Sequence, residues 1–195
     1  MRFAPGALYL LLAMPFARTW LESTMALHML VQIPLLAAIG VVTCCSLPEH
    51  WQQRALAWAG GPVAWVLVAL FASSYWMLPR ALDAALADPL HEAAKFLCLP
   101  ALVGLPLALA WRRLSVLGRG FVLTNFSSML AVLGWLYLAA PQRVCNSYLV
   151  SQQESAGWLM IELAVLLFCG WLVTLFAATR PAHGRAHAPA PGARS

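Results

Sequence analysis

The chain has 195 residues, of which 62% are hydrophobic and only 10% are charged. Soluble globular domains contain roughly 45–50% apolar and about 25% charged residues, and a domain of this size still leaves about a third of its surface in water. A soluble protein and an intrinsically disordered chain are therefore both excluded. The composition predicts a polytopic membrane protein, an all-α bundle of transmembrane helices.

The charge balance indicates orientation in a membrane rather than a nucleic-acid partner. Twelve Lys and Arg residues stand against 7 Asp and Glu, which gives a net charge of +5. No basic run is interleaved with aromatic residues, so we expect the lipid bilayer as a partner and no nucleic acid. The 5 cysteines have no C-x-x-C spacing and predict neither a disulfide framework nor a zinc site.

The first apolar segment, residues 3–16, is short for a membrane span. Arg2 precedes it and Arg18 follows it, so a signal peptide is the rival interpretation. We favour a retained helix with Arg18 at the interface, because Trp20 begins the next helical pattern at once.

Five longer segments each provide the roughly 20 apolar residues that a span needs. In chain order they are residues 23–46, 56–79, 93–111, 120–140 and 156–178. We therefore expect six spans, or five if the first segment is not retained, within a bundle over residues 1–180. Residues 181–195 are Pro, Ala, Gly, His and Arg without periodicity, which predicts a disordered basic cytoplasmic tail.

The basic residues predict which side each loop occupies. With six spans and the N-terminus inside, 8 of the Lys and Arg residues fall on the inner side and 4 on the outer side. Arg112, Arg113 and Arg119 share one short inner loop. The positive-inside rule then predicts that both termini lie on the cytoplasmic side of the membrane, which we expect to be a bacterial inner membrane.

Two ionisable residues lie well inside predicted spans, where charge is unfavourable. His28 is about five residues into its span, and Glu162 is six residues into the last, or roughly 9 Å at 1.5 Å per residue. Since their depths match, we expect the two side chains to pair. The alternative is a neutral Glu162 bonded to a backbone carbonyl.

Met25, His28, Met29 and Gln32 follow the i, i+3, i+4, i+7 spacing of one helix face. Arg18 and Glu22 continue this stripe outward at i, i+4 spacing. Two thioethers beside an imidazole suit soft Cu(I), and the candidate metal ligands are Met25, His28, Met29 and Glu162. The alternative is ordinary packing of the methionines, with His28 and Gln32 hydrogen-bonding across helices.

Two segments resemble the integral-membrane caa3-type cytochrome c oxidase assembly factors. Residues 27–36 (LHMLVQIPLL) resemble the His-Met-rich helix of that family, and residues 151–160 (SQQESAGWLM) resemble its Gln-Gln…Gly…Met approach to a late helix. Gln32 stands where the family tends to have a second histidine, and Ser151 where an Asp is usual. The resemblance implies help in supplying copper to the oxidase from the outer side of the membrane.

Three functions fit these features. The first is a non-enzymatic inner-membrane protein that handles Cu(I) during oxidase assembly, with an oxidase subunit or a periplasmic copper chaperone as partner. The second is a structural subunit or scaffold in which buried polar residues fix helix register. The third is a b-type haem or other membrane redox protein, with His28 as one ligand. No nucleophile–base pair, phosphate loop or carboxylate dyad is present, so we assign no catalysis.

Overall fold

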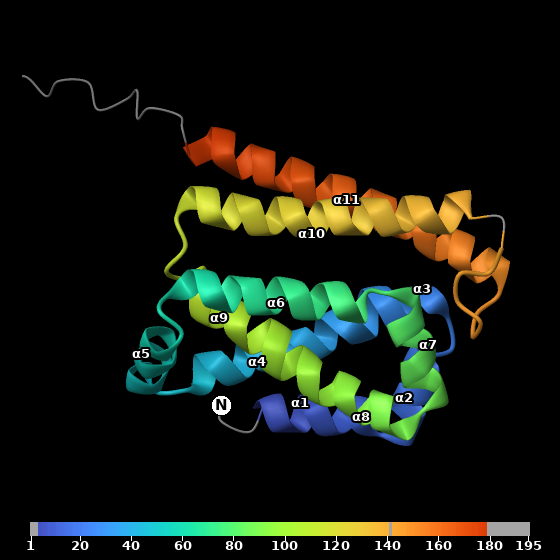
Figure 1. Ribbon diagram of the computed structural model, residues 1–195, viewed down its shortest axis with the longest axis horizontal. Helices are drawn as coiled ribbons and strands as arrows, with labels where there is room; N and C mark the ends of the chain where they lie inside the picture. The colour runs from blue at the N-terminus through green and yellow to red at the C-terminus, as the bar shows by residue number, and fades with distance from the viewer. Residues whose placement is uncertain (1–3, 141, 179–195) are drawn as a thin grey trace, which may run out of the picture.

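The computed structural model describes residues 4–140 and 142–178, and these contain helices and no strand. The all-α class is thereby confirmed, whereas the predicted tail, residues 181–195, lies outside the described residues. The α-helices and the two π-helical segments, η1 and η2, follow in chain order (Figure 1): α1 (Ala4–Ala13), α2 (Pro15–Leu21), α3 (Met25–Leu27), η1 (His28–Gln32), α4 (Ile33–Ser46), α5 (Glu49–Trp58), α6 (Pro62–Trp76), α7 (Pro79–Ala87), α8 (Pro89–Cys98), η2 (Leu99–Gly104), α9 (Leu105–Trp111), α10 (Val116–Ala139) and α11 (Val150–Ala178).

Four helical stretches are long and apolar enough to cross a membrane. They are Met25–Ser46, Pro89–Trp111, Val116–Ala139 and Val150–Ala177. A fifth span is present if α5 and α6 together make one crossing. These stretches correspond to the second, fourth, fifth and sixth segments expected from hydropathy.

The span predicted over residues 56–79 is not one continuous helix, because the chain bends by 83° between α5 and α6. Gly60 and Gly61 have φ angles of 74° and 123°, a region that side chains with a Cβ rarely adopt. Pro62 then starts α6, which has 15 residues. Helix α5 lies across the end of the bundle instead of continuing α6 (Figure 1).

The first apolar segment forms α1 and α2, separated at Met14 by extended backbone before Pro15. These helices have 10 and 7 residues, so each is too short to cross a bilayer alone. The structure therefore supports four spans, or five if the bent pair is one span. It does not support the sixth span that was expected from the first apolar segment.

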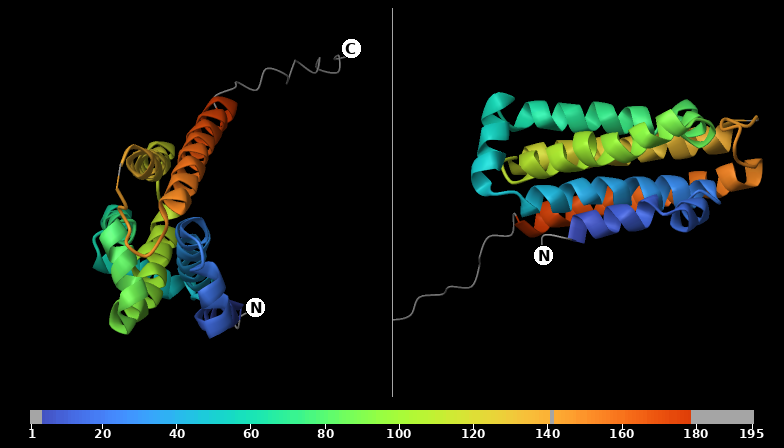
Figure 2. Two further views of the ribbon diagram at one scale, coloured as in Figure 1. Left: turned by 90° about the vertical axis from the view of Figure 1, so that its right-hand side faces the viewer. Right: turned by 90° about the horizontal axis from the view of Figure 1, so that it is seen from below.

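Helices α10 and α11 pack closely along one side of the molecule, as two views show (Figures 1 and 2). Gly134 and Gly157 lie at their crossing, where a Cβ on Gly157 would stand 2.9 Å from the Gly134 carbonyl oxygen. Small residues let helix backbones approach in this way in membranes. Ser127 Oγ adds a 2.6 Å hydrogen bond to the Ala164 carbonyl. The glycine crossing and this hydrogen bond together fix the rotation of α11 about its own axis.

The second close crossing joins α4 to η2. A Cβ on Gly40 would overlap the Pro100 carbonyl oxygen, and one on Gly104 would overlap the Ala37 carbonyl oxygen. Pro100 has no N–H to donate, and the π-helical turn around it accommodates the missing hydrogen bond. Two backbones therefore lie in direct contact directly after α8.

The loops gather at two opposite ends of the bundle (Figure 1). Helices α2 and α7 and the connection from α10 to α11 lie at one end; α5 and the connection from α9 to α10 lie at the other. We call the first the polar-loop end. This grouping matches the alternation of loops expected from hydropathy.

Candidate functional site

The predicted stripe of Met25, His28, Met29 and Gln32 lies in the core at the polar-loop end, and all four side chains have 0% relative exposure. Thr24 caps the short α3, since its Oγ1 accepts a hydrogen bond from the Leu27 N–H at 3.3 Å. A threonine at this position satisfies a backbone donor that the first turn leaves unpaired. The chain then enters η1, which carries three of the four residues. Single π-helical turns are frequent at functional sites, because the wider turn redirects side chains.

Lys95 is the centre of the polar cluster, although it was not among the candidate residues predicted from the sequence. Its ammonium donates to Glu22 Oε1 at 2.7 Å, to Gln32 Oε1 at 3.2 Å and to His28 Nε2 at 3.2 Å. An ammonium has three donors, so these bonds use all of them. The side chain is fully buried on α8. One signal could have found it, because Lys95 is the only lysine in the sequence.

The hydrogen bonds assign the tautomer of His28. Nε2 faces the Lys95 ammonium, which can only donate, so Nε2 is the accepting nitrogen. Nδ1 then carries the proton and donates to Tyr148 Oη at 2.9 Å. Tyr148 in turn donates to the Glu22 carbonyl oxygen at 3.1 Å. Both imidazole nitrogens are thus engaged, and a continuous chain of bonds runs from Lys95 to the backbone at Glu22.

The loop before α11 holds Tyr148 in place. Asp83 on α7 accepts hydrogen bonds from the N–H groups of Asn146 and Ser147 at 2.8 and 3.2 Å. Gln153 accepts from the Val144 N–H at 2.9 Å and donates to the Tyr137 carbonyl at 3.0 Å. Burial, together with the nearby Glu22 carboxylate, raises the pKa of the Tyr148 hydroxyl, so it stays protonated as a donor.

Two thioethers complete the site. Met25 and Met29 are fully buried in the same cluster as Tyr137, and the Tyr137 hydroxyl lies 3.5 Å from Met29 Sδ. In this contact the Tyr137 hydroxyl donates to a lone pair of the Met29 sulfur. The two thioethers and the imidazole of His28 therefore belong to one short, fully buried stretch of chain.

The expected pairing of His28 with Glu162 is wrong. His28 bonds to Tyr148 and Lys95, whereas Glu162 is exposed on α11. Within the described residues Glu162 makes neither a hydrogen bond nor an ion pair. The physical reason is the rotation of α11, since its contact with α10 turns Gly157, Met160 and Ala164 inward and Glu162 outward.

Arg18 does not continue the stripe as expected, because it forms an ion pair with a neighbouring helix. Arg18 Nη1 lies 2.8 Å from Glu92 Oε1, while Glu22 pairs with Lys95. The two pairs join the chain around α2 to α8. Glu22 is the member of the central cluster that reaches the surface, with 14% of its side chain exposed.

Cys145, at the same end of the molecule, provides a test of the packing. Burial, with a contribution from the Asp83 carboxylate, raises the pKa of its thiol to about 12. The thiolate is the reactive form, so Cys145 stays protonated and unreactive across neutral pH. We expect N-ethylmaleimide to label the exposed Cys45 and to spare Cys145 in the folded protein between about pH 7 and about pH 9.

Mass spectrometry of the digested protein measures this labelling. Protein unfolded in detergent is the control and labels at both positions. Labelling of Cys145 in the folded protein at the rate of Cys45 would contradict the buried environment.

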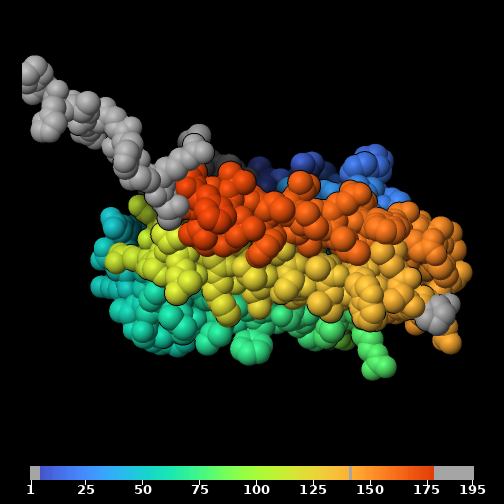
Figure 3. All heavy atoms as spheres, turned by 90° about the horizontal axis from the view of Figure 1, so that it is seen from above, coloured from blue at the N-terminus to red at the C-terminus, as the bar shows by residue number. Residues whose placement is uncertain are grey.

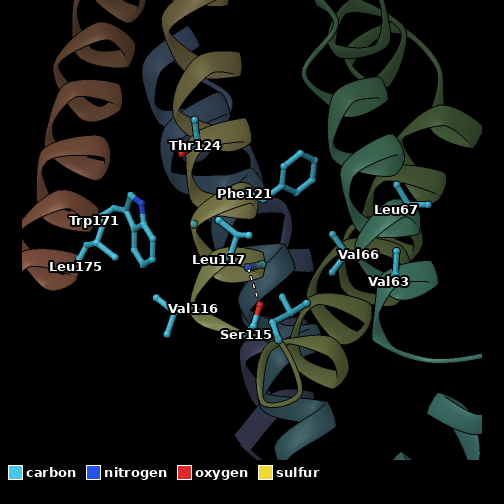
Figure 4. A pocket seen from close by; sticks show the side chains of 13 residues that line it. Val63, Val66, Leu67, Ser115, Val116, Leu117, Phe121, Thr124, Trp171 and Leu175 are labelled. Atoms are coloured by element: carbon cyan, nitrogen blue, oxygen red, sulfur yellow. Dashed lines mark hydrogen bonds between the residues drawn. The ribbon is translucent and has the colours of Figure 1, made fainter. Parts of the chain in front are cut away.

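An open groove with a volume of about 1000 Å³ lies at the opposite end of the molecule. It lies between α6, α10 and α11, and Figure 4 shows Val63, Val66 and Leu67 on one side and Trp171 and Leu175 on the other. None of its lining side chains is titratable. This groove offers no metal or acid–base chemistry, so the polar cluster is the candidate site.

The fold and the cluster define a helical bundle with membrane-spanning helices and a buried His–Lys–Glu network near one end. The chain matches no protein-family model, and it has no significant match among curated proteins or solved structures. Among the described residues, no three His, Cys, Asp or Glu side chains are grouped so that they could hold a metal ion. Any metal held here would therefore depend on thioethers together with His28.

Proposed function

We propose that this protein binds Cu(I) with Met25, His28 and Met29 and assists the assembly of a cytochrome oxidase in a bacterial inner membrane. The observation that carries the proposal is the complete burial of two thioethers and one imidazole on the stretch of chain that enters η1. Thioethers bind Cu(I) without losing a proton, and a neutral imidazole adds one stronger bond. Glu162 is left out of the proposed set because it lies on the outer surface of α11.

The Lys95 ammonium faces His28 Nε2 at 3.2 Å and so occupies the lone pair that the metal would need. Cu(I) carries the same charge and would compete for the same lone pair. Withdrawal of Lys95 toward Glu22, to which it is bonded at 2.7 Å, would free Nε2 for the metal. Metal binding then displaces the ammonium from Nε2, while Lys95 stays paired with Glu22.

The sidedness belongs to the same proposal. With both termini in the cytoplasm, the polar-loop end faces the periplasm, and copper reaches the cluster without crossing the bilayer. A non-catalytic role follows, with an oxidase subunit or a periplasmic copper chaperone as the exchange partner. Reporter fusions after Arg143 and at the C-terminus test the orientation, and a cytoplasmic signal at Arg143 would contradict it.

Copper retention by the purified protein tests the metal site. After anaerobic loading with Cu(I), we expect His28→Ala and Met25→Leu/Met29→Leu to weaken retention against a Cu(I) chelator by at least about ten-fold, or about 1.4 kcal/mol. Met129→Leu is the matched control, since Met129 packs beside the core on α10 and bonds only to Ser74. Oxidase activity in membranes gives the second measurement. Undiminished copper retention in all variants would overturn the proposal.

A structural scaffold is the second candidate, and one observation favours it. The Lys95, His28 and Tyr148 donors are all satisfied within the protein, as expected for a network that fixes helix register. A scaffold predicts that His28→Ala lowers the stability of the protein and that neither the parent protein nor the variant retains copper.

A further inference from the structure

Helix α11 is much less buried than the other spans. In the most apolar stretch of α11, 11% of the residues are buried, compared with 33% to 44% in the corresponding stretches of the other three spans. Seen from above, α11 forms the surface of the molecule along its whole length (Figure 3). Helix α11 packs against α10 and also against α3, and the remainder of its surface is open to lipid or to another protein.

The outward residues of α11 recur with alternating steps of four and three. We call the following exposed residues the outer stripe: Ser155, Leu159, Glu162, Leu166, Cys169 and Val173. This is the a/d spacing of a heptad repeat, which lets two helices pack knobs into holes. At about 100° per residue the stripe lies on the far side of the helix from the buried Gly157, Met160 and Ala164.

Glu162 belongs to this stripe and lies well inside the apolar span Val150–Ala177. It follows Ala156, the first residue of the apolar run, by about 9 Å, and it precedes Ala177 by about 22 Å. An exposed carboxyl at this depth is unfavourable unless another protein group satisfies it. Lys95, the lone cation of the cluster, already uses all three donors elsewhere. The group that satisfies Glu162 therefore comes from outside the described chain.

We propose that a second copy of this chain docks on the outer stripe and forms a parallel dimer with a two-fold axis along the membrane normal. A two-fold axis brings each residue of the stripe to its own counterpart at the same depth. A neutral carboxyl is both a donor and an acceptor, so two Glu162 side chains satisfy each other without a complementary charge. The other positions of the stripe are small or medium-sized and uncharged, which suits close packing in lipid.

Cys169 is a natural reporter for this dimer. In a two-fold pairing through the outer stripe, the two Cys169 thiols face each other. The test uses Cys45→Ser, which removes the exposed cysteine outside the stripe. We expect iodine, a membrane-permeant oxidant, to link this variant into disulfide-bonded dimers in native membranes.

The matched control moves the thiol to α10. Thr124 is exposed, and it lies eight residues from the start of α10 as Cys169 lies eight residues from Ala177, so the depths agree. Cys45→Ser/Cys169→Ser/Thr124→Cys is expected to give no dimer. Absence of the Cys169 dimer, equal linking from both positions, or linking of Cys169 to a different protein would each overturn the proposal.

Glu162 variants test the carboxyl pair. Glu162→Gln keeps a donor and an acceptor, and we expect the same yield of linked dimer. Glu162→Leu removes both and is expected to lower the yield about five-fold or more. Both variants are first checked for normal abundance and for the protection of Cys145 from maleimide. An undiminished dimer in Glu162→Leu would overturn the role of the carboxyl, and copper retention does not enter any of these outcomes.

Discussion

Replacing Lys95 with methionine is expected to lower the free energy of unfolding by about 3–5 kcal/mol. The substitution leaves the partly buried Glu22 carboxylate without its cation and removes the donor from His28 Nε2 and Gln32 Oε1. An uncompensated buried charge is among the largest single-residue effects on stability. Unfolding of the purified protein by increasing denaturing detergent measures the change. Arg143→Met, which removes an exposed cation from a loop, is the control and should change stability by at most about 0.5 kcal/mol.

A second substitution separates the lost charge pair from the lost packing. In Glu22→Gln/Lys95→Met no unpaired carboxylate remains at position 22, and the amide there can still bond to Gln32. We expect the double variant to regain about 1–3 kcal/mol relative to Lys95→Met alone. If the double variant is no more stable than the single one, the ion pair is not the source of the loss.

The same double variant distinguishes the two proposed functions. With Lys95 replaced, His28 Nε2 has no competing cation, and the new thioether adds a soft donor beside it. A copper site predicts Cu(I) retention at least equal to that of the parent protein. A scaffold predicts no retention in either protein.

Gly104→Ala is expected to destabilise the protein by about 3 kcal/mol. The new methyl group would overlap the Ala37 carbonyl oxygen and would lie 3.0 Å from the Gly40 Cα, so α4 and η2 would have to move apart. Both contacts involve backbone, which cannot rotate away as a flexible side chain does. Because η2 continues α8, the shift would also disturb Lys95 and the polar cluster.

Gly170→Ala is the matched control for this substitution. A Cβ at Gly170 meets nothing within 4 Å, and alanine favours helix by up to about 1 kcal/mol over glycine. Thermal unfolding in detergent compares the two variants. Equal stability of Gly104→Ala and Gly170→Ala would show that the α4–η2 crossing can open without loss.

The inward face of the second apolar segment was predictable from its sequence. Met25, His28, Met29 and Gln32 follow one helical face, and the structure buries all four. Local spacing is sufficient here because polar groups in a span turn away from lipid wherever neighbouring helices allow it. Composition likewise predicted the all-α class and four of the apolar spans.

The bend between α5 and α6 was missed because hydropathy treats Gly60 and Gly61 as neutral residues. Their positive φ angles end α5, so the apolar run does not continue as one helix. The pair Gly60-Gly61 before Pro62 was the available signal, since glycine and proline together commonly mark a break.

Composition and local spacing were enough to predict the fold class, four of the apolar spans and the short stretch that carries two thioethers and an imidazole. The groups that meet His28 could not be predicted in this way, because Lys95 and Tyr148 are 67 and 120 residues away in the chain and reach it through the packing of the helices. The tertiary structure also decided that Glu162 faces outward. Depth along a helix follows from counting residues, but rotation about the helix axis is set by the neighbour, and the close contact of Gly134 with Gly157 turns Glu162 away from the bundle.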